Sequence, residues 1–147
     1  MRANEMTEII GVTFPIPKKY MNRFFLDGKT VFIKPANCFK KIHPGMKFIF
    51  YQSHEDTGFI GEGKIVRISM EDDPLLFIEQ FKDRIFLTPD EIMAYITQQG
   101  KWSGIRARRD KIKKKLWMAI ELKAIKKYDQ ISKPARFVPV SGQYLRR

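Results

Sequence analysis

Two strand patterns joined by a short polar turn constrain the fold of this 147-residue chain more than any other feature. The first pattern is KFIFYQS (47–53), which alternates between two faces, and the second is FIGEGKIVRISM (59–70), which is rich in β-branched residues. The residues between them are HEDTG (54–58), which predict a hairpin turn and therefore antiparallel pairing. A parallel pair would need a crossover of about a dozen residues, so this turn excludes a βαβ unit here.

Weaker patterns before and after this hairpin predict further strands and helices. We expect Pro15 and Pro17 to end the first strand, because proline cannot donate to a central ladder, and Gly28 to end the first helix. The late strand places alternate apolar residues on one face, namely Leu116, Met118, Ile120, Leu122 and Ala124. The strands are predicted at 8–17, 29–35, 47–53, 59–70, 116–128 and 136–140, and the helices at 18–28, 72–83 and 88–100.

The clearest helix pattern covers residues 88–100. Thr88 is expected as the N-cap and Pro89 at the first helical position. Glu91 lies three residues after Thr88, which is the spacing of a capping box, and Gly100 supplies the stop signal.

Together these patterns predict an α+β fold with a small, mostly antiparallel β-barrel and flanking helices, formed by residues 1–147 as a single domain. The hydrophobic content of 44% excludes global disorder. The single cysteine, Cys38, excludes an internal disulfide and a cysteine-rich zinc site. No apolar stretch approaches about 18 residues and the start of the chain lacks a signal-peptide core, so we expect a cytoplasmic protein with no membrane partner.

The net charge of +12 is confined to the last third of the chain. Residues 1–100 hold 13 basic and 13 acidic residues, whereas residues 101–147 hold 15 basic and 3 acidic residues. Such a block favours a surface that faces a polyanion, with nucleic acid first, over charge that serves general solubility. The alternative is a solvated basic helix or tail without a specific partner.

The densest part of this block is IRARRDKIKKK (105–115), with seven basic residues and one acidic residue. Its positive charge could release counterions from nucleic acid in either a helical or an extended form. Trp102, between two glycines, is the best candidate for an exposed ring that stacks on an unpaired base. The candidate phosphate contacts are Arg106, Arg108, Arg109, Lys113, Lys114 and Lys115.

Motifs for catalysis and metal binding are weak. The run GFIGEGKI (58–65) has the glycines and Lys64 of a P-loop, but Ile65 stands where a Ser or Thr should bind magnesium. Its three glycines instead indicate strong strand curvature, close backbone approach or the mouth of a ligand site. His43 and His54 lack ligand spacing, and we expect no metal and no cofactor. Glu62 is the one weak candidate for acid–base catalysis.

The hairpin with its flanks resembles the barrel core of the PUA-like superfamily, which includes PUA, ASCH and EVE domains. The matching residues are a turn at Pro44-Gly45, a strand ending in Tyr51-Gln52-Ser53, and a return through Gly61-Glu62-Gly63-Lys64-Ile65. The late strand and the tail PARFVPVSGQYLRR are similar to the closing strand and tail of such proteins. The whole chain is similar to a small archaeal family of unknown function in that group.

This resemblance implies a pseudo-barrel with a cleft between barrel and helices, and RNA or a modified base as ligand. It implies that Tyr51, Ser53 and the strand Gly61–Gly63 line the cleft, with the basic segment and the tail Ser141–Tyr144 nearby. The Gly-x-Lys-x-x-Glu signature of ASCH domains is missing, because Ile49 and Phe50 stand where the acid would fall. That departure weakens the case for a hydrolase of the ASCH type.

Three functions remain open. The first is an RNA-binding module, the second a small enzyme on a nucleoside or nucleotide with Glu62 or Lys64 as acid–base group, and the third an interaction module for an acidic or ribosomal partner. Binding is favoured over catalysis, because PUA domains usually accompany a separate catalytic domain. The residues predicted to bind RNA are Tyr51, Ser53, Gly61, Gly63, Lys64, Trp102, Arg106, Arg108, Arg109, Lys113, Lys114 and Lys115.

Overall fold

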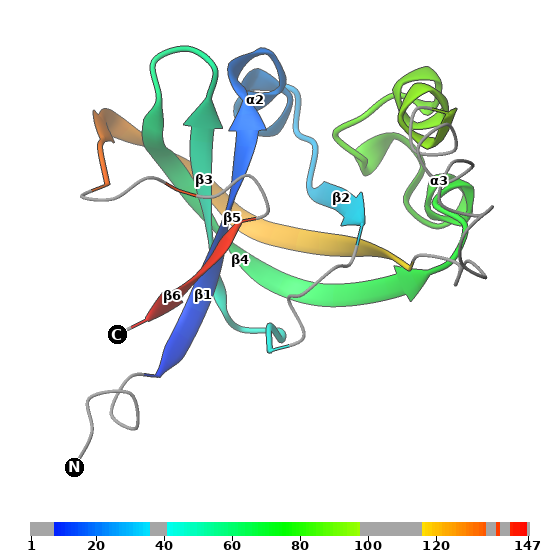
Figure 1. The fold of residues 1–147 in the computed structure, drawn as a ribbon, viewed down its shortest axis with the longest axis horizontal. Helices are drawn as coiled ribbons and strands as arrows, with labels where there is room; N and C mark the ends of the chain where they lie inside the picture. The colour runs from blue at the N-terminus through cyan, green and yellow to red at the C-terminus, as the bar shows by residue number, and fades with distance from the viewer. Residues whose placement is uncertain (1–7, 36–40, 98–115, 135–137, 139–141, 147) are drawn as a thin grey trace, which may run out of the picture.

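The computed structural model describes residues 8–35, 41–97, 116–134, 138 and 142–146. Strands and helices alternate irregularly along the chain, as the sequence predicts (Figure 1). The strands are β1 (Ile9–Pro17), β2 (Val31–Pro35), β3 (Lys47–Ser53), β4 (Gly58–Glu71), β5 (Trp117–Ser132) and β6 (Gln143–Arg146). The helices are α2 (Lys18–Phe25), α3 (Leu75–Phe81), the 3-10 turn η1 (Lys82–Arg84) and a further helix that includes residues 89–97.

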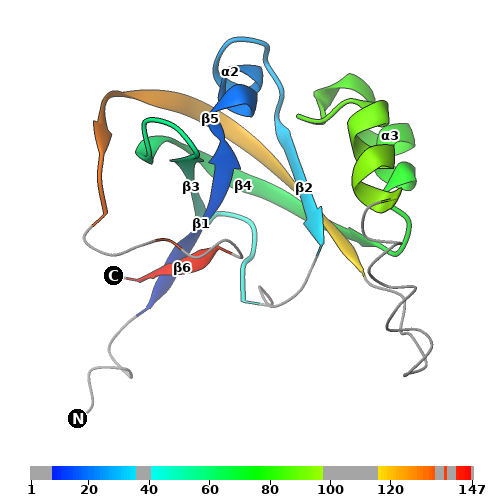
Figure 2. The same cartoon turned by 45° about the horizontal axis from the view of Figure 1, so that its top comes forward.

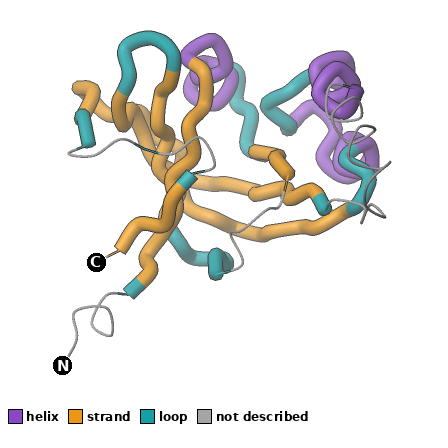
Figure 3. Tube along the Cα trace, viewed as in Figure 1, coloured by secondary structure: helices purple, strands orange, loops and turns teal. Residues whose placement is uncertain are grey.

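The strands form one six-stranded sheet in the order β2-β5-β4-β3-β1-β6. Every neighbouring pair is antiparallel except β1 and β3, which run parallel and are linked through α2 and β2. The long strands β4 and β5 curve together, so the sheet curls into a half-barrel (Figures 1 and 3). Helix α3 lies on the β2 side of the sheet in both cartoon views (Figure 2). The predicted α+β, mostly antiparallel barrel is confirmed.

The half-barrel stays open between β1 and β2. Strand β6 pairs with β1 only as far as Thr13, which lies opposite Gln143, so the last residues of β1 extend beyond this ladder. As the sequence predicts, β1 includes both prolines and ends at Pro17, and it stays paired with β3 from Pro15 to Pro17. Proline can sit on a strand with a free edge, since its missing N–H removes nothing from the ladder on the other side. The same missing N–H groups leave this edge unable to complete a new ladder.

Phenylalanine rings fill the inside of the curled sheet. Phe48 and Phe50 of β3 are fully buried, as their alternation in the hairpin predicts. Phe48 packs against Phe14 and Phe32, with ring centroids 5.8 and 5.3 Å away. Phe50 packs against Phe24 of α2 at 4.9 Å, so the rings join the sheet to this helix.

The apolar face predicted for the late strand is buried only in the middle of the strand. Met118, Ile120 and Leu122 are buried, but Leu116 and Ala124 are exposed. Ala124 has a φ of 53°, and the register between β4 and β5 shifts close to it, so the alternation breaks there. The strand predicted at 136–140 lies outside the described residues apart from Val138, and β6 follows it at the C-terminal end.

The capping box predicted for the helix after η1 is confirmed. The backbone N–H of Glu91 donates to Oγ1 of Thr88 at 3.2 Å, and the N–H of Thr88 donates to Oε1 of Glu91 at 2.8 Å. The predicted stop at Gly100 lies outside the described residues. Among the helices that the structure describes, none is long and apolar enough to cross a membrane.

Candidate binding pocket

A pocket of about 690 Å³ occupies the open seam between β1 and β2. Aromatic rings and prolines form most of its wall, with two charged residues among them. Its lining residues are Phe14, Pro15, Ile16, Pro17, Tyr20, Phe32, Ile33, Lys34, Pro35, Phe86, Leu87, Glu91, Tyr95 and Trp117. A concave, mostly apolar site with a few polar groups is the usual form of a small-ligand site.

The strand side of the pocket is built by stacked rings. Phe14 of β1 and Phe32 of β2 stack across the seam with centroids 5.3 Å apart. The ammonium of Lys34 lies 4.4 Å from the centroid of the Phe14 ring, so a positive charge sits at this wall. Because Pro15 and Pro17 have no N–H, the free edge of β1 offers only acceptors at these two positions.

The helix side of the pocket carries a second group of rings. Tyr95 meets Trp117 edge to face at 5.3 Å, and Tyr20 meets Phe86 edge to face at 5.8 Å. Trp117 is 5% exposed and belongs to the core, whereas Tyr95 is 43% exposed. Partial burial raises the pKa of the Tyr95 phenol above its ordinary value, so this ring presents a neutral hydroxyl at neutral pH.

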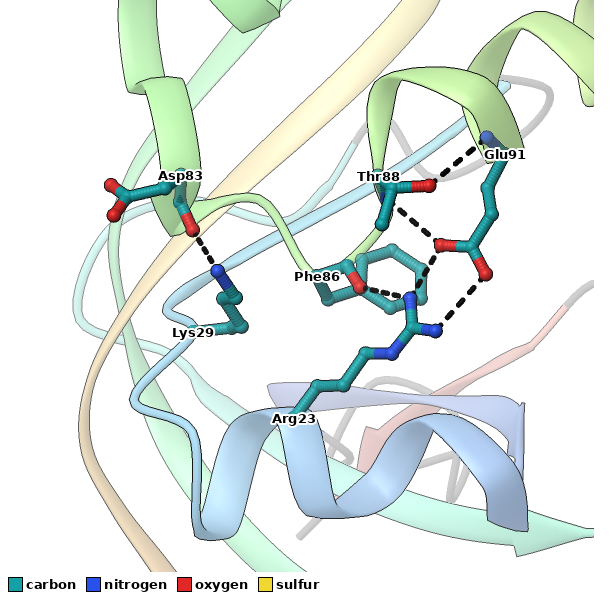
Figure 4. Close-up of polar contacts among 6 residues, drawn as sticks. All are labelled: Arg23, Lys29, Asp83, Phe86, Thr88 and Glu91. Atoms are coloured by element: carbon teal, nitrogen blue, oxygen red, sulfur yellow. Dashed lines mark hydrogen bonds and ion pairs between the residues drawn. The ribbon is translucent and has the colours of Figure 1, made fainter.

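An ion pair between α2 and the helical residues 89–97 fixes the helix side (Figure 4). Arg23 donates from Nη1 to Oε1 of Glu91 at 2.5 Å and from Nη2 to Oε2 at 3.0 Å, and it also donates to the carbonyl oxygen of Phe86 at 2.9 Å. Its guanidinium lies 4.7 Å from the centroid of Tyr20, which lines the pocket. The bonds from Arg23, with smaller help from Thr88, lower the pKa of Glu91 to about 2.

A second bond joins the segment after α2 to η1. Lys29 donates from Nζ to the carbonyl oxygen of Asp83 at 2.5 Å (Figure 4). Together with the Arg23–Glu91 pair, it connects the two ends of the segment that carries Phe86 and Leu87 into the pocket wall. The wall is therefore held by charge-assisted bonds between elements far apart in sequence.

The predicted cleft residues on β3 and β4 do not line this pocket. Tyr51 is buried, and its ring lies 5.5 Å from that of Phe59 instead. The register between β3 and β4 shifts between Phe50 and Tyr51. Ser53 is partly exposed at the end of β3, and Lys64 is exposed on β4. Their predicted contact with RNA stays a prediction, at a different place from the pocket.

Gly61 and Gly63 of β4 differ in how much space a side chain would have at each position. A side chain at Gly61 would meet the Phe25 ring at 2.5 Å and the Lys126 carbonyl oxygen at 2.6 Å. At Gly63 the nearest atom is Cγ1 of Ile125 at 3.3 Å. Gly61 therefore admits a ring of α2 against the sheet, which is the close approach that the glycine-rich sequence indicates.

Glu62, the weak catalytic candidate, also lies outside the pocket wall. Its Oε1 accepts a hydrogen bond from the Tyr128 hydroxyl at 3.0 Å, and its Oε2 lies 3.7 Å from Nζ of Lys47. Burial, and next the bond to Glu62, raise the pKa of Tyr128 to about 12. The carboxylate is thus engaged in contacts between β3, β4 and β5.

The remaining predicted RNA contacts, Trp102 and the basic residues Arg106 to Lys115, lie outside the described residues. The chain leaves the described helix at Thr97, shortly after Tyr95, and returns at Leu116, next to Trp117. Both flanking aromatics line the pocket. Within the part of the chain that the structure describes, no group of three or more His, Cys, Asp or Glu residues could hold a metal ion.

Sequence reasoning missed the seam and therefore most of the residues that line the pocket. The run Phe14-Pro15-Ile16-Pro17 could have indicated the open seam, because two prolines in a strand indicate a free edge. Nothing local connects this run to Lys34 or to Tyr95, which reach the same pocket from other elements.

Comparison with known proteins identifies the family. Residues 9–147 match the family described as "Domain of unknown function (DUF365)", so the chain belongs to this family. It is 42% identical over 101 residues to "Uncharacterized protein MJECS03" of Methanocaldococcus jannaschii, which covers 69% of this chain and 90% of that protein. Neither description states an activity.

Solved structures confirm the resemblance to the PUA-like superfamily at the level of the fold. The ASCH protein from Zymomonas mobilis matches with a TM-score of 0.66 at 15% identity, covering 94% of this chain and 89% of that chain. A Tyr-to-Phe variant of that protein matches with a TM-score of 0.71 at 13% identity, covering 94% of this chain and 91% of that chain. At these identities the likeness concerns the fold alone.

Proposed function

We propose that this member of the DUF365 family is an RNA-binding module that holds an unpaired base in the seam pocket. The observation that carries the proposal is the pocket of about 690 Å³ with aromatic rings on both walls and Lys34 beside Phe14. Base stacking on an aromatic side chain contributes about 1–3 kcal/mol per base and tolerates any sequence. The PUA-like fold, many of whose members act on RNA, supports the same ligand class.

The distribution of charge supports RNA over a free small molecule. The sequence between Thr97 and Leu116 carries eight basic residues and one acidic residue, and its two ends adjoin residues of the pocket wall. Phosphate contacts from Arg106, Arg109 and their basic neighbours would position the strand, while the pocket rings would hold the base. Trp102, in the same stretch, would add a further stacking surface.

The contacts of the carboxylates favour binding over acid–base catalysis. In the pocket wall, Glu91 is bonded to Arg23 and Thr88, and its pKa of about 2 keeps it ionised at neutral pH. Such a group is a poor proton donor or acceptor near pH 7. Glu62 is engaged with Tyr128 on another part of the sheet.

The test compares two exposed residues of one helix. Tyr95→Ala removes a pocket ring, and Met93→Ala removes an exposed side chain that is absent from the pocket lining. Fluorescence anisotropy with a labelled single-stranded RNA should show that Tyr95→Ala weakens binding by about 5- to 150-fold, the equivalent of one stacked base. Met93→Ala should bind like the unmodified chain.

A salt titration of the same binding reaction completes the test. About five phosphate contacts on a single strand give a log–log slope of affinity against salt of roughly −3.5. A flat titration, or equal losses for the tyrosine and methionine variants, would refute the proposed function.

A further inference from the structure

Three lysines stand directly opposite one another on three adjacent strands. Lys47 of β3 pairs with Lys64 of β4, and Lys64 pairs with Lys123 of β5. Residues paired across neighbouring strands project to the same face of a sheet, with Cβ atoms about 4.5–5.5 Å apart. All three side chains are exposed, and we call them the lysine row.

The lysine row lies on the face of the sheet opposite to the core. Side chains alternate along a strand, so Lys47 points away from the face that Phe48 fills. Phe48 packs against Phe14 and Phe32, and both of these rings line the seam pocket. The row is therefore on the outer face of β3, β4 and β5, separate from the pocket.

The positive charge of the row is only partly compensated. Glu62 contacts Lys47 at 3.7 Å, but it also accepts the Tyr128 hydroxyl and lies opposite Lys126, a further exposed lysine. Lys64, Lys123 and Lys126 form no ion pair with any residue that the structure describes. Like charges directly opposite one another in a sheet are destabilising. At a strand spacing of about 4.8 Å, the outer members of the row lie about 10 Å apart, within one Debye length at about 0.1 M salt.

We propose that the lysine row binds the phosphate backbone of RNA, as a second contact outside the seam pocket. The inference rests on the proposed function, because it assigns a further surface to the same RNA. A line of exposed ammonium groups can contact several phosphates of one RNA strand, and lysine is a common phosphate ligand. Lysine is depleted in protein–protein interfaces, which argues against an acidic protein as the partner.

The experiment compares two double variants that remove the same charge. Lys64→Gln with Lys123→Gln breaks the row. Lys41→Gln with Lys127→Gln removes two exposed lysines outside the row. Lys41 precedes β3, and Lys127 follows Lys126 in β5, so its side chain points to the other face of the sheet. Binding is measured in the full chain with single-stranded RNAs of about 4 and about 16 nucleotides.

The row variant should bind the longer RNA several-fold more weakly, with a salt slope reduced by about 1.4, since each lost contact removes about 0.7. Its affinity for the short RNA, which reaches only the pocket, should not change. The control variant should match the unmodified chain with both RNAs. Thermal unfolding of the row variant should not fall below that of the unmodified chain, because the substitution removes repulsion.

Equal losses of RNA affinity in the row and control variants would overturn the proposal, because they would show that RNA responds to the total positive charge and not to the lysine row. A row variant that binds the longer RNA as tightly as the unmodified chain would also overturn the proposal. The proposed function would then stand if Tyr95→Ala still weakens RNA binding. Tighter binding of polyglutamate than of the longer RNA, with the same dependence on the row, would overturn it in favour of an acidic protein partner. If neither RNA binds to the unmodified chain, both proposals fail.

Discussion

Glu91 shows how one residue can serve a helix and a binding site together. It closes the capping box with Thr88, and the same carboxylate receives both Nη groups of Arg23 from α2. The sequence predicts the capping box, because its partners are three residues apart, but not the ion pair, because Arg23 lies 68 residues away. Local spacing thus reveals the first role of Glu91, and only the folded chain reveals the second.

The lowered pKa of Glu91 predicts a specific loss of stability in acid. Its pKa falls from 4.5 to about 2 on folding, so its stabilising effect is complete above about pH 4.5 and is lost as the pH falls toward 2. Glu91→Gln should lower the free energy of unfolding at pH 7 by about 1.5 kcal/mol, the lower end for a bond between charged groups. Thermal unfolding from pH 7 to pH 2 should show the difference from the unmodified chain shrinking below pH 4.5.

The matched control is Glu79→Gln, on the exposed side of α3. Glu79 forms no ion pair with any residue that the structure describes, so its replacement should leave the change in stability between pH 4.5 and pH 2 the same as in the unmodified chain. A constant difference between Glu91→Gln and the unmodified chain across this pH range would contradict the assigned role of the ion pair.

At the scale of elements, β4 depends on one of its glycines far more than on another. Gly61→Ala would place Cβ 2.5 Å from the Phe25 ring and 2.6 Å from the Lys126 carbonyl oxygen, and a backbone atom cannot move aside easily. We expect a loss of about 1–3 kcal/mol in the free energy of unfolding, as for other overpacked sites. Gly63→Ala meets its nearest neighbour, Cγ1 of the Ile125 side chain, at 3.3 Å and should cost less than about 1 kcal/mol.

Chemical denaturation of both glycine variants measures the two effects side by side. Equal stabilities would show that the contact between α2 and β4 is looser than the packing of Phe25 implies. The sequence indicates that glycines in this strand allow close approach, but it does not identify the ring that approaches, because Phe25 comes from another element.

Elements with strong local signals could be predicted, and those that depend on distant partners could not. The strand at 47–53 follows its alternation and a turn of fixed length, and its predicted bounds are correct. The strand that ends at Pro17 is also predicted, but the sequence does not show which edge of β1 remains free, because that depends on pairing with β6 from the other end of the chain. The exposed Ala124 follows from a register shift between two long strands, which periodicity alone does not predict.

At the scale of the whole molecule, the two ends of the described chain meet in β1 and β6. Four residue pairs join these strands, from Ile9 opposite Arg146 to Thr13 opposite Gln143. The hydroxyl of Tyr144 accepts the N–H of Lys41 at 2.9 Å, and Gly142, with a φ of 93°, lies close against the ring of Phe14. Strand β6 therefore supports the segment of β1 that leads into the pocket.

Removal of residues 143–147 should accordingly weaken both the fold and the pocket. Each backbone hydrogen bond contributes about 0.5–1.5 kcal/mol net, so we expect a loss of about 2–4 kcal/mol in the free energy of unfolding, measured by denaturant titration. RNA affinity should fall as well, because β6 would no longer hold Gly142 against the ring of Phe14. Arg146→Gln, which keeps the ladder and removes only a charge, should retain the stability of the unmodified chain. If the shortened chain unfolds at the same denaturant concentration as the unmodified chain, β6 does not hold the edge of β1, and the open seam must be maintained by β3 and the packed rings alone.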